Sequence, residues 1–246
     1  LARQTDTPVI LVLNAKGMSR SVVPLLRGFA DYEKENRRIR GVILNRISAG
    51  MFPMMKKWVD YMHSAGDEEF LWLGGNHYGD WLGLDAAEGS YDGATDKSFL
   101  SDAFYAYSTN ILAKAMAIIG EDNSEYLTLY DNIVKEFKVR FSEYTETQTA
   151  CVIQLHFGLC DDREKVVKKL AKLIRDNGTA LTTGFVGTPY LLHALSANGE
   201  AELAYDLLLR REYPSWLYPV TVGATTIWEH WDGMKPDGSM WSTDMN

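Results

Sequence analysis

The spacing of hydrophobic residues changes part way along the chain, and this change constrains the fold more than any other feature. Val9–Leu13 and Val42–Leu44 are continuous apolar runs, typical of strands buried on both faces of a parallel sheet. From Ser98 onward, apolar residues recur instead at i, i+3, i+4 and i+7, which is the spacing of helices. A parallel pair needs neighbouring strands to complete a sheet, and no further run of that kind follows. The sequence therefore predicts two parts of different class.

Residues 8–47 are expected to form one βαβ unit. Gly17 turns the chain after the first apolar run, and Ser19 or Ser21 can cap the helix that follows. The second apolar run then returns the chain as a parallel strand. The apolar face of the expected helix consists of Val22, Leu25, Leu26 and Phe29.

After residue 97 the spacing predicts helices joined by short connections, the pattern of antiparallel helical hairpins. Tyr126, Ile133 and Phe137 mark the clearest stripe, while Asp161–Asp162 opens a later helix that Gly178 closes. The expected helices cover residues 98–119, 126–137, 147–159, 161–177, 186–197 and 200–208. We therefore expect an all-α toroid of helical hairpins, of which the chain contains a part.

Three connections are much longer and are rich in Gly, Thr, Trp and Asp. They are residues 71–96, 178–188 and 213–239. Long loops on a rigid helical frame are where binding and catalysis usually sit. In the last of them Glu229 stands between Trp228 and Trp231. Aromatic faces suit the C–H faces of a sugar ring. An apolar surround disfavours the charged carboxylate and can raise its pKa toward the range useful for a general base. The alternative is a core Trp pair with a surface Glu between.

The first long connection places Asp80 and Trp81 after three glycines, which let the backbone bend and present both side chains. Asp80 could accept hydrogen bonds from vicinal hydroxyls, and Trp81 could stack on a sugar ring. Alternatively, Asp80 caps a helix and Trp81 lies in the core. The connection at residues 181–190 leads into a helix with Pro189 near its first turn, and taken alone it reads as a plain helix start.

Composition excludes some classes of partner. The chain has 33 acidic and 25 basic residues, and its net charge of −8 argues against a surface for nucleic acid or an anionic membrane. No stretch of 18 apolar residues is present. Cys151 and Cys160 lie in helix-like sequence, so they imply neither a disulfide framework nor a Cys-rich metal site, and we expect no metal or other cofactor. The 7 tryptophans fit carbohydrate binding.

Several of these segments, in this order, resemble the bacterial α-L-rhamnosidases over about residues 54–246. The segments are Gly79-Asp80-Trp81-Leu82 and residues 145–150, 182–190, 212–219 and 224–232. The resemblance implies a six-hairpin (α/α) barrel and inverting hydrolysis of terminal α-L-rhamnosides, with Glu229 as the general base. It also implies a sugar-binding wall of Trp81 with Asp80, next to the 182–187 loop, and a rhamnose-containing oligosaccharide or glycoside as partner. Together with the flanking tryptophans, the predicted substrate-binding residues are Asp80, Trp81, Thr183, Phe185, Trp228 and Trp231.

Two features of that family are not found in this sequence. The family takes its general acid from an Asp/Glu/Arg-rich segment ahead of the Gly-Asp-Trp loop, and no such segment occurs here. A substrate-binding His that follows Asp-Met-Asn in the family has no counterpart either, since the sequence ends at Asn246. Asp80, Asp85 or Glu88 could replace the acid, although the family places none of them in that role. We therefore expect a catalytic-domain fragment with half of its acid/base pair, inactive as it stands.

Residues 1–57 resemble a different family, cobyrinic acid a,c-diamide synthase, on Thr7–Ser21 and Arg40–Gly50. The resemblance implies part of an ATP-binding domain of the P-loop type, which in that family precedes a glutamine amidotransferase domain. Yet no Gly-x-x-x-x-Gly-Lys-Ser/Thr motif occurs, and neither cysteine has the context of a nucleophile elbow. Met54–Lys57 fits both families, and we interpret it as a junction between two unrelated segments.

The sequence thus predicts a mainly α chain with two domains. A partial (α/α)6 barrel covers residues 58–246, and a βαβ fragment of a P-loop-type α/β domain covers residues 1–53. One alternative function is a non-catalytic carbohydrate-binding module that keeps the aromatic wall. Another is an ATP-dependent glutamine amidotransferase of corrinoid synthesis, which would need the missing phosphate loop. The first residues do not form a signal peptide, so a cytoplasmic location is expected. The sequence does not specify the aglycone, the linkage or the oligomeric state.

Overall fold

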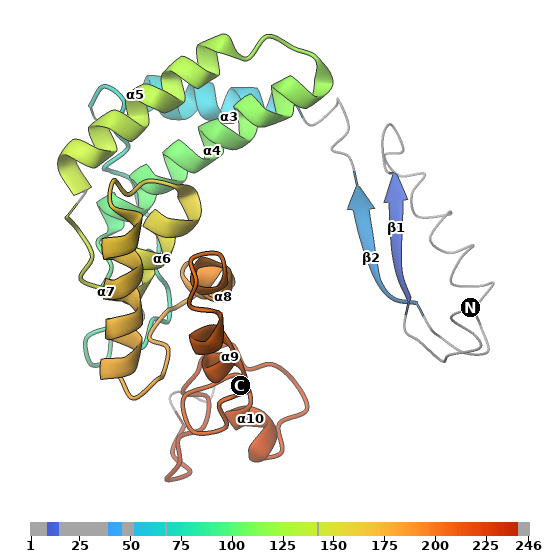
Figure 1. The fold of residues 1–246 in the computed structure, drawn as a ribbon, viewed down its shortest axis with the longest axis vertical. Helices are drawn as coiled ribbons and strands as arrows, with labels where there is room; N and C mark the ends of the chain where they lie inside the picture. Colours follow the sequence, from blue (N-terminus) through green and yellow to red (C-terminus); the bar gives the residue numbers. More distant parts are fainter. Residues whose placement is uncertain (1–8, 15–38, 46–51, 67, 142, 241–246) are drawn as a thin grey trace. The chain divides into compact units, whose positions relative to one another are not determined.

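Helices make up most of the structure, a computed structural model that describes residues 9–14, 39–45, 52–66, 68–141 and 143–240 (Figure 1). The chain divides into two compact units. The first unit comprises residues 1–64 with 111–126, and the second comprises residues 65–110 with 127–246. The prediction of a mainly α chain is confirmed. No helix within the described ranges combines the length and the apolar character needed to cross a bilayer.

Two short strands in the first unit pair in parallel, as the two apolar runs predicted. β1 (Val9–Asn14) lies alongside β2 (Ile39–Asn45), with Ile10 opposite Gly41. The second strand begins at Ile39 and so takes in residues ahead of the apolar run from which it was predicted. The helix expected around Val22–Phe29 lies outside the described residues. Within the described part of the chain, the sheet has these two strands.

The same unit contains α3 (Phe52–Ala65), which is held to residue 126 by a cluster of polar side chains. The buried Tyr126 donates a hydrogen bond from its hydroxyl to Asp60 Oδ1 at 2.5 Å, and Lys56 Nζ donates to the same hydroxyl. Lys56 and Asp60 also form an ion pair at 3.5 Å, one helical turn apart. Val59 and Met62 of this helix are buried, so α3 makes both apolar and polar contacts.

The first helical hairpin joins α4 (Lys97–Ile119) to α5 (Ser124–Phe141), and both helices were predicted. Gly120 ends α4 with a φ of +81°, in the left-handed region where glycine is favoured. Within the second unit, the buried ring of Phe99 on α4 meets Phe137 on α5 at a centroid distance of 5.3 Å. This aromatic contact holds the hairpin closed at that end.

The second hairpin consists of α6 (Gln148–Phe157) and α7 (Arg163–Asp176). Thr147 caps α6 by accepting a hydrogen bond from Ala150 N at 3.0 Å, and Asp162 caps α7 by accepting from Lys165 N at 2.9 Å. A side-chain oxygen at this position satisfies one of the backbone N–H groups that a helix start leaves unpaired. The predicted capping residue of α7 is therefore confirmed.

The third hairpin consists of α8 (Thr188–Ser196) and α9 (Ala201–Leu209), and the short α10 (Tyr218–Thr221) follows. The prediction started α8 at residue 186, but residues 186 and 187 still belong to the preceding loop. Their backbone N–H groups donate to the Asp80 carboxylate. The predicted bounds of α9 differ from the observed ones by one residue at each end.

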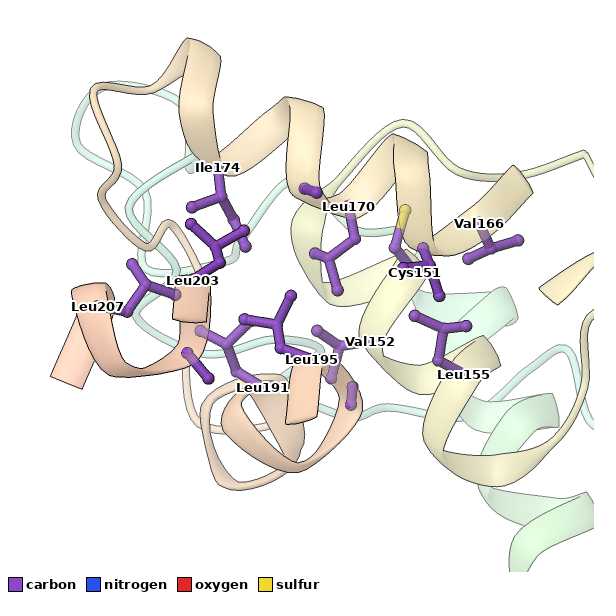
Figure 2. Packing of buried hydrophobic residues seen from close by; sticks show 14 of the residues in the cluster. Cys151, Val152, Leu155, Val166, Leu170, Ile174, Leu191, Leu195, Leu203 and Leu207 are labelled. Atoms are coloured by element: carbon purple, nitrogen blue, oxygen red, sulfur yellow. The ribbon is translucent and has the colours of Figure 1, made fainter. Parts of the chain in front are cut away.

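One apolar core unites the second and third hairpins, with α6 between α7 and α8 and with α9 against α8 (Figure 2). Leu170 of α7 and Leu191 of α8 are fully buried. Each such Leu or Ile stabilises the fold by about 1.5–3 kcal/mol relative to leaving it exposed. Labelled in Figure 2 are Cys151, Val152, Leu155, Val166, Leu170, Ile174, Leu191, Leu195, Leu203 and Leu207. This core gives the loops at the helix ends a rigid base.

Candidate functional site

A pocket of about 540 Å³ lies in the second unit, between α8, α10 and the loops around them. Aromatic and aliphatic side chains form most of its wall, and its volume falls within the range usual for small-molecule sites. Its lining residues are Leu82, 184–185, 188–189, 192–193, Trp216, 219–220 and 226–231. The pocket therefore draws on all three of the long connections that the sequence singled out.

Glu229 and the two tryptophans around it all line this pocket, as predicted. The carboxylate is exposed, whereas Trp228 and Trp231 are half-buried. Trp231 donates its indole N–H to Thr183 O at 3.1 Å and meets Trp216 edge to face at 5.2 Å. The aromatic neighbours therefore form the wall rather than an enclosure of Glu229, and the carboxylate remains accessible to water. The expected apolar surround of Glu229 was wrong in that respect.

His230 lies next to Glu229, is 4% exposed and also lines the pocket. Its Nδ1 accepts a hydrogen bond from Asp232 N at 2.9 Å, so that nitrogen carries no proton in this arrangement. Burial lowers the pKa of His230, with Lys235 acting in the same direction, while Asp232 and Glu229 act against them. Burial and the hydrogen bond from Asp232 N thus both favour the neutral imidazole, with Nδ1 as acceptor.

Asp232 is itself fixed by two partners. It is 7% exposed, accepts a hydrogen bond from the Tyr213 hydroxyl and lies 3.6 Å from Lys235 Nζ. Burial and the bond to Asp232 together raise the pKa of Tyr213, so the phenol stays protonated and remains a donor. The segment that carries Glu229 is thus held by the contacts of the buried Asp232 with Tyr213 and Lys235.

Asp80 was predicted to bind sugar hydroxyls, but its carboxylate is fully buried and does not line the pocket. Oδ1 accepts from Val186 N at 2.8 Å and from Gly187 N at 3.1 Å. Oδ2 accepts from Thr149 Oγ1 at 2.5 Å and from Gly184 N at 2.9 Å. Four protein donors occupy the two oxygens, and the geometry gives Asp80 a structural role in place of the predicted contact.

Trp81 lies beside the pocket rather than in its wall. Its ring stacks on Tyr91 at a centroid distance of 4.9 Å and meets the edge of Tyr78 at 5.1 Å. One face of the indole is therefore already covered by protein. Stacking of a sugar on the remaining face stays a prediction.

The 182–187 loop is held in place by backbone contacts on two sides. Phe185 N donates to Trp81 O at 2.9 Å, and Leu84 N donates to Thr182 O at 2.8 Å. Thr183 is fully buried and its hydroxyl pairs with that of Thr188 at 2.8 Å, so its side chain does not reach the pocket. Phe185 is 54% exposed and does line the pocket. Of the two candidates in this loop, Phe185 alone faces the site.

Gly184 allows the closest approach between the loop and its neighbour. A Cβ on this residue would lie 2.3 Å from Trp81 O, 2.6 Å from Gly83 N and 2.8 Å from Asp80 O. All three are backbone atoms, which cannot swing aside as a side chain can. The residue type is therefore dictated by packing between two loops of the site.

Neither of the other carboxylates considered as a substitute acid lines the pocket. Asp85 accepts a hydrogen bond from Ala94 N at 2.9 Å, and burial raises its pKa. Glu88 is exposed in the same loop. Among the described residues that line the pocket, Glu229 is the single carboxylate.

Helix α8 contributes side chains to the pocket that were not among the predicted site residues. Pro189, Leu192 and His193 line the pocket from this helix, and Trp216 does so from the loop before α10. The first three stand at i, i+3 and i+4, so a helical face continuing from the 182–187 loop could have indicated them. No three His, Cys, Asp or Glu side chains among the described residues come together as metal ligands would.

Comparison with known proteins places the helical part in one family. Residues 45–245 match the family described as the bacterial alpha-L-rhamnosidase six-hairpin glycosidase domain. The chain is 36% identical to an alpha-L-rhamnosidase of Formosa agariphila over 191 residues, which are 74% of this chain and 20% of that protein. The crystal structure of Streptomyces avermitilis alpha-L-rhamnosidase complexed with L-rhamnose is similar in fold, with a TM-score of 0.74 and 33% identity. That likeness covers 80% of this chain and 19% of that one.

A second, much shorter similarity concerns a different class of protein. Over 46 residues the chain is 46% identical to the cobyrinate a,c-diamide synthase of Syntrophotalea carbinolica. These residues are 19% of this chain and 10% of that protein. The chain spans about a fifth of the length of the curated rhamnosidases that it matches.

Proposed function

Because the chain belongs to the bacterial α-L-rhamnosidase six-hairpin glycosidase family, we propose that its pocket binds a terminal α-L-rhamnosyl group and presents Glu229 as the general base. An inverting glycosidase needs one carboxylate to activate water and a second carboxyl group to protonate the leaving oxygen from the opposite face. Glu229 suits the first role because it is exposed at the pocket and reaches solvent.

The observation that carries the proposal is the joint position of Glu229, Trp228, Trp231 and Phe185 around one pocket. The aromatic side chains offer flat apolar faces to the C–H groups of a sugar, and Glu229 is the carboxylate beside them. L-Rhamnose is the bound sugar named for the Streptomyces avermitilis relative, which supports the choice of ligand.

The general acid is the part of the mechanism that these residues do not supply. The sequence contains no Asp/Glu/Arg-rich segment ahead of the Gly-Asp-Trp loop, and neither Asp85 nor Glu88 lines the pocket. A positioned general acid contributes about 10²–10⁴-fold to the rate. We therefore propose that a polypeptide of these 246 residues binds L-rhamnose without appreciable hydrolysis.

The finer architecture is also a proposal. The three helical hairpins fit a partial (α/α)6 barrel over residues 58–246. Residues 1–53 would be a βαβ fragment of a P-loop-type α/β domain, resembling cobyrinic acid a,c-diamide synthase. The parallel pairing of β1 with β2 and the 46-residue similarity support this assignment. A structure in which both strands join a sheet of four or more strands of this same chain would contradict it.

Calorimetry and a chromogenic assay test the function together. We expect the 246-residue polypeptide to bind L-rhamnose but not D-glucose, and to release no nitrophenol from 4-nitrophenyl α-L-rhamnoside. Trp228→Ala should weaken rhamnose binding, because it removes one wall of the pocket. If wild type shows turnover that Glu229→Gln abolishes, another residue supplies the acid. If wild type binds no rhamnose, the proposed function is wrong.

A non-catalytic carbohydrate-binding module is the second candidate. The single carboxylate among the described lining residues favours it. The two candidates differ in what Glu229 does. If Glu229→Gln left both rhamnose affinity and its pH dependence unchanged, the pocket would bind sugar without using that carboxylate.

A further inference from the structure

The Asp80 carboxylate lies where two helices begin. Thr149 is in the first turn of α6, and Gly187 is the residue immediately before α8. At the start of α8, Thr188 N and Tyr190 N are already bonded to Gly184 O and Gly187 O, and Pro189 has no N–H, so the donors left for a further acceptor are those of the residues just before the helix. The buried Asp80 carboxylate accepts from the Thr149 hydroxyl in α6 and from Gly187 N just before α8, although Asp80 belongs to neither helix.

Helix α8 has no cap of its own. Its N-cap residue is Gly187, which has no side chain to accept a hydrogen bond. Asp80 Oδ1 instead accepts from Val186 N and Gly187 N, the two residues ahead of the helix, from a position 106 and 107 residues earlier in the chain. The start of α8 is therefore fixed by a distant segment.

The residues that Asp80 holds also form one wall of the pocket. Gly184 and Phe185 line it, as do Thr188 and Pro189 at the start of α8. Gly184 N donates to Asp80 Oδ2, and Phe185 N donates to the neighbouring Trp81 O. Movement of the carboxylate would therefore displace the backbone on which Phe185 is presented.

We propose that Asp80 is a positioning residue of this site. Its carboxylate clamps residues 184–187 so that Phe185 and the first turn of α8 form the sugar-binding wall, and it does not contact the ligand. This inference rests on the proposed function, because the wall is defined by the pocket that binds rhamnose. Thr149 is the second member of the clamp, since its hydroxyl fills the remaining position on Oδ2.

Three of the four partners are backbone N–H groups, which require an acceptor, whereas the Thr149 hydroxyl can also accept. In Asp80→Asn one oxygen becomes an NH₂ group of nearly the same size, and at either position its hydrogens face at least one backbone N–H. A buried donor facing donors is left unsatisfied, and the neighbouring backbone has to move or lose its partner. Thr149→Val removes one donor and keeps the side-chain shape, while Thr149→Ser keeps the hydroxyl and serves as the matched control.

Hydrogen–deuterium exchange of the peptide covering residues 182–188, together with calorimetry of L-rhamnose binding, tests the proposal on the 246-residue chain. We expect Asp80→Asn to speed exchange in that peptide by roughly tenfold to a hundredfold, as expected when one or two hydrogen bonds to a charged acceptor are lost. Exchange in α7 should stay unchanged, and rhamnose affinity should fall by about tenfold, which corresponds to about 1.4 kcal/mol. Thr149→Val should show the same pattern to a smaller degree, and Thr149→Ser should behave as wild type.

Other outcomes would overturn the inference. Weaker rhamnose binding with unchanged exchange would mean that Asp80 contacts the sugar directly. Equal acceleration in α7 would mean a general loss of stability, and faster exchange with unchanged affinity would mean that residues 184–187 are not part of the site. If Asp80→Asn does not fold, Thr149→Val decides by the same criteria. If wild type binds no rhamnose, the proposed function fails, and the exchange pattern still shows whether Asp80 clamps this loop.

Discussion

Asp102 makes the stability of the second unit depend on pH. The residue lies on α4 and is fully buried. Its Oδ1 accepts a hydrogen bond from Trp72 N at 3.0 Å, and its Oδ2 has no hydrogen-bond partner among the described residues. Burial raises the pKa of this carboxyl from 3.8 to about 7, against the opposing effects of the Trp72 hydrogen bond and the Arg140 charge. At a pH between these two values, the folded protein therefore keeps a proton on Asp102 that the unfolded chain releases.

The direction of the effect follows from this difference. The folded pKa is above the unfolded one, so the stabilisation is complete below pH 4 and is lost as the pH rises through about 7. The difference between 3.8 and about 7 corresponds to about 4 kcal/mol in the free energy of unfolding. Between these two pKa values the free energy of unfolding of wild type therefore falls as the pH rises.

Asp102→Asn removes the titration and keeps the shape. The Asn oxygen can still accept from Trp72 N, and the amide carries no charge at any pH in the window. We expect the variant to gain stability relative to wild type as the pH rises from 4 to 8, by about 4 kcal/mol over the whole range. Urea unfolding followed by tryptophan fluorescence at one-unit pH steps measures this, with the exposed Asp206→Asn as control. If the free energies of unfolding of wild type and Asp102→Asn change with pH in parallel, the reasoning about Asp102 is wrong.

Four further substitutions test the packing of the second unit by urea unfolding. Gly184→Ala should destabilise by about 1–3 kcal/mol, because its Cβ would meet backbone of residues 80–83. Gly89→Ala has open space and a φ of +75°, so it should cost about 1–2 kcal/mol from backbone strain alone and, unlike Gly184→Ala, leave rhamnose affinity intact. Trp231→Phe should lower the free energy of unfolding by about 1 kcal/mol and weaken rhamnose binding, because the hydrogen bond from the indole N–H to Thr183 O is lost. If neither stability nor affinity changed, Trp231 would not be part of the pocket wall. Leu170→Ala should cost about 2–5 kcal/mol, and a loss below about 1 kcal/mol would show that the α6–α9 core is not the main one.

The helices of the second unit could be predicted because local patterns determine them. Ile133 and Phe137 recur at helical spacing and are buried on one face of α5. Asp162 caps α7 through a neighbour three residues away, which a sequence pattern can reveal. The start of α8 was predicted two residues early because it depends on Asp80, which lies more than a hundred residues away.

In the site, too, residues close together in the sequence were predicted better than contacts between distant segments. Glu229, Trp228 and Trp231 are adjacent in sequence and meet at one pocket. Asp80 was predicted to bind sugar hydroxyls, but it is fully buried and bonded to protein donors. A local motif shows neither the burial of a side chain nor the donors that other segments bring to it. His193 was not singled out at all, since a histidine within an apolar helical stretch reads as part of the scaffold.

Three carboxylates of the second unit show that surroundings, more than residue type, decide what each one does. Asp80 meets four donors, from residues 69 to 107 positions away, and serves as an acceptor that joins two helix starts. Asp102 meets one backbone donor, has a second oxygen without a partner, and keeps its proton up to a pH of about 7. Glu229 is exposed at the pocket, where it can reach the water that a general base has to activate. A carboxylate that is fully engaged by the protein cannot also activate water, and one that is exposed cannot hold two helices together. The division of roles therefore follows from the number of donors around each carboxylate and from its access to solvent.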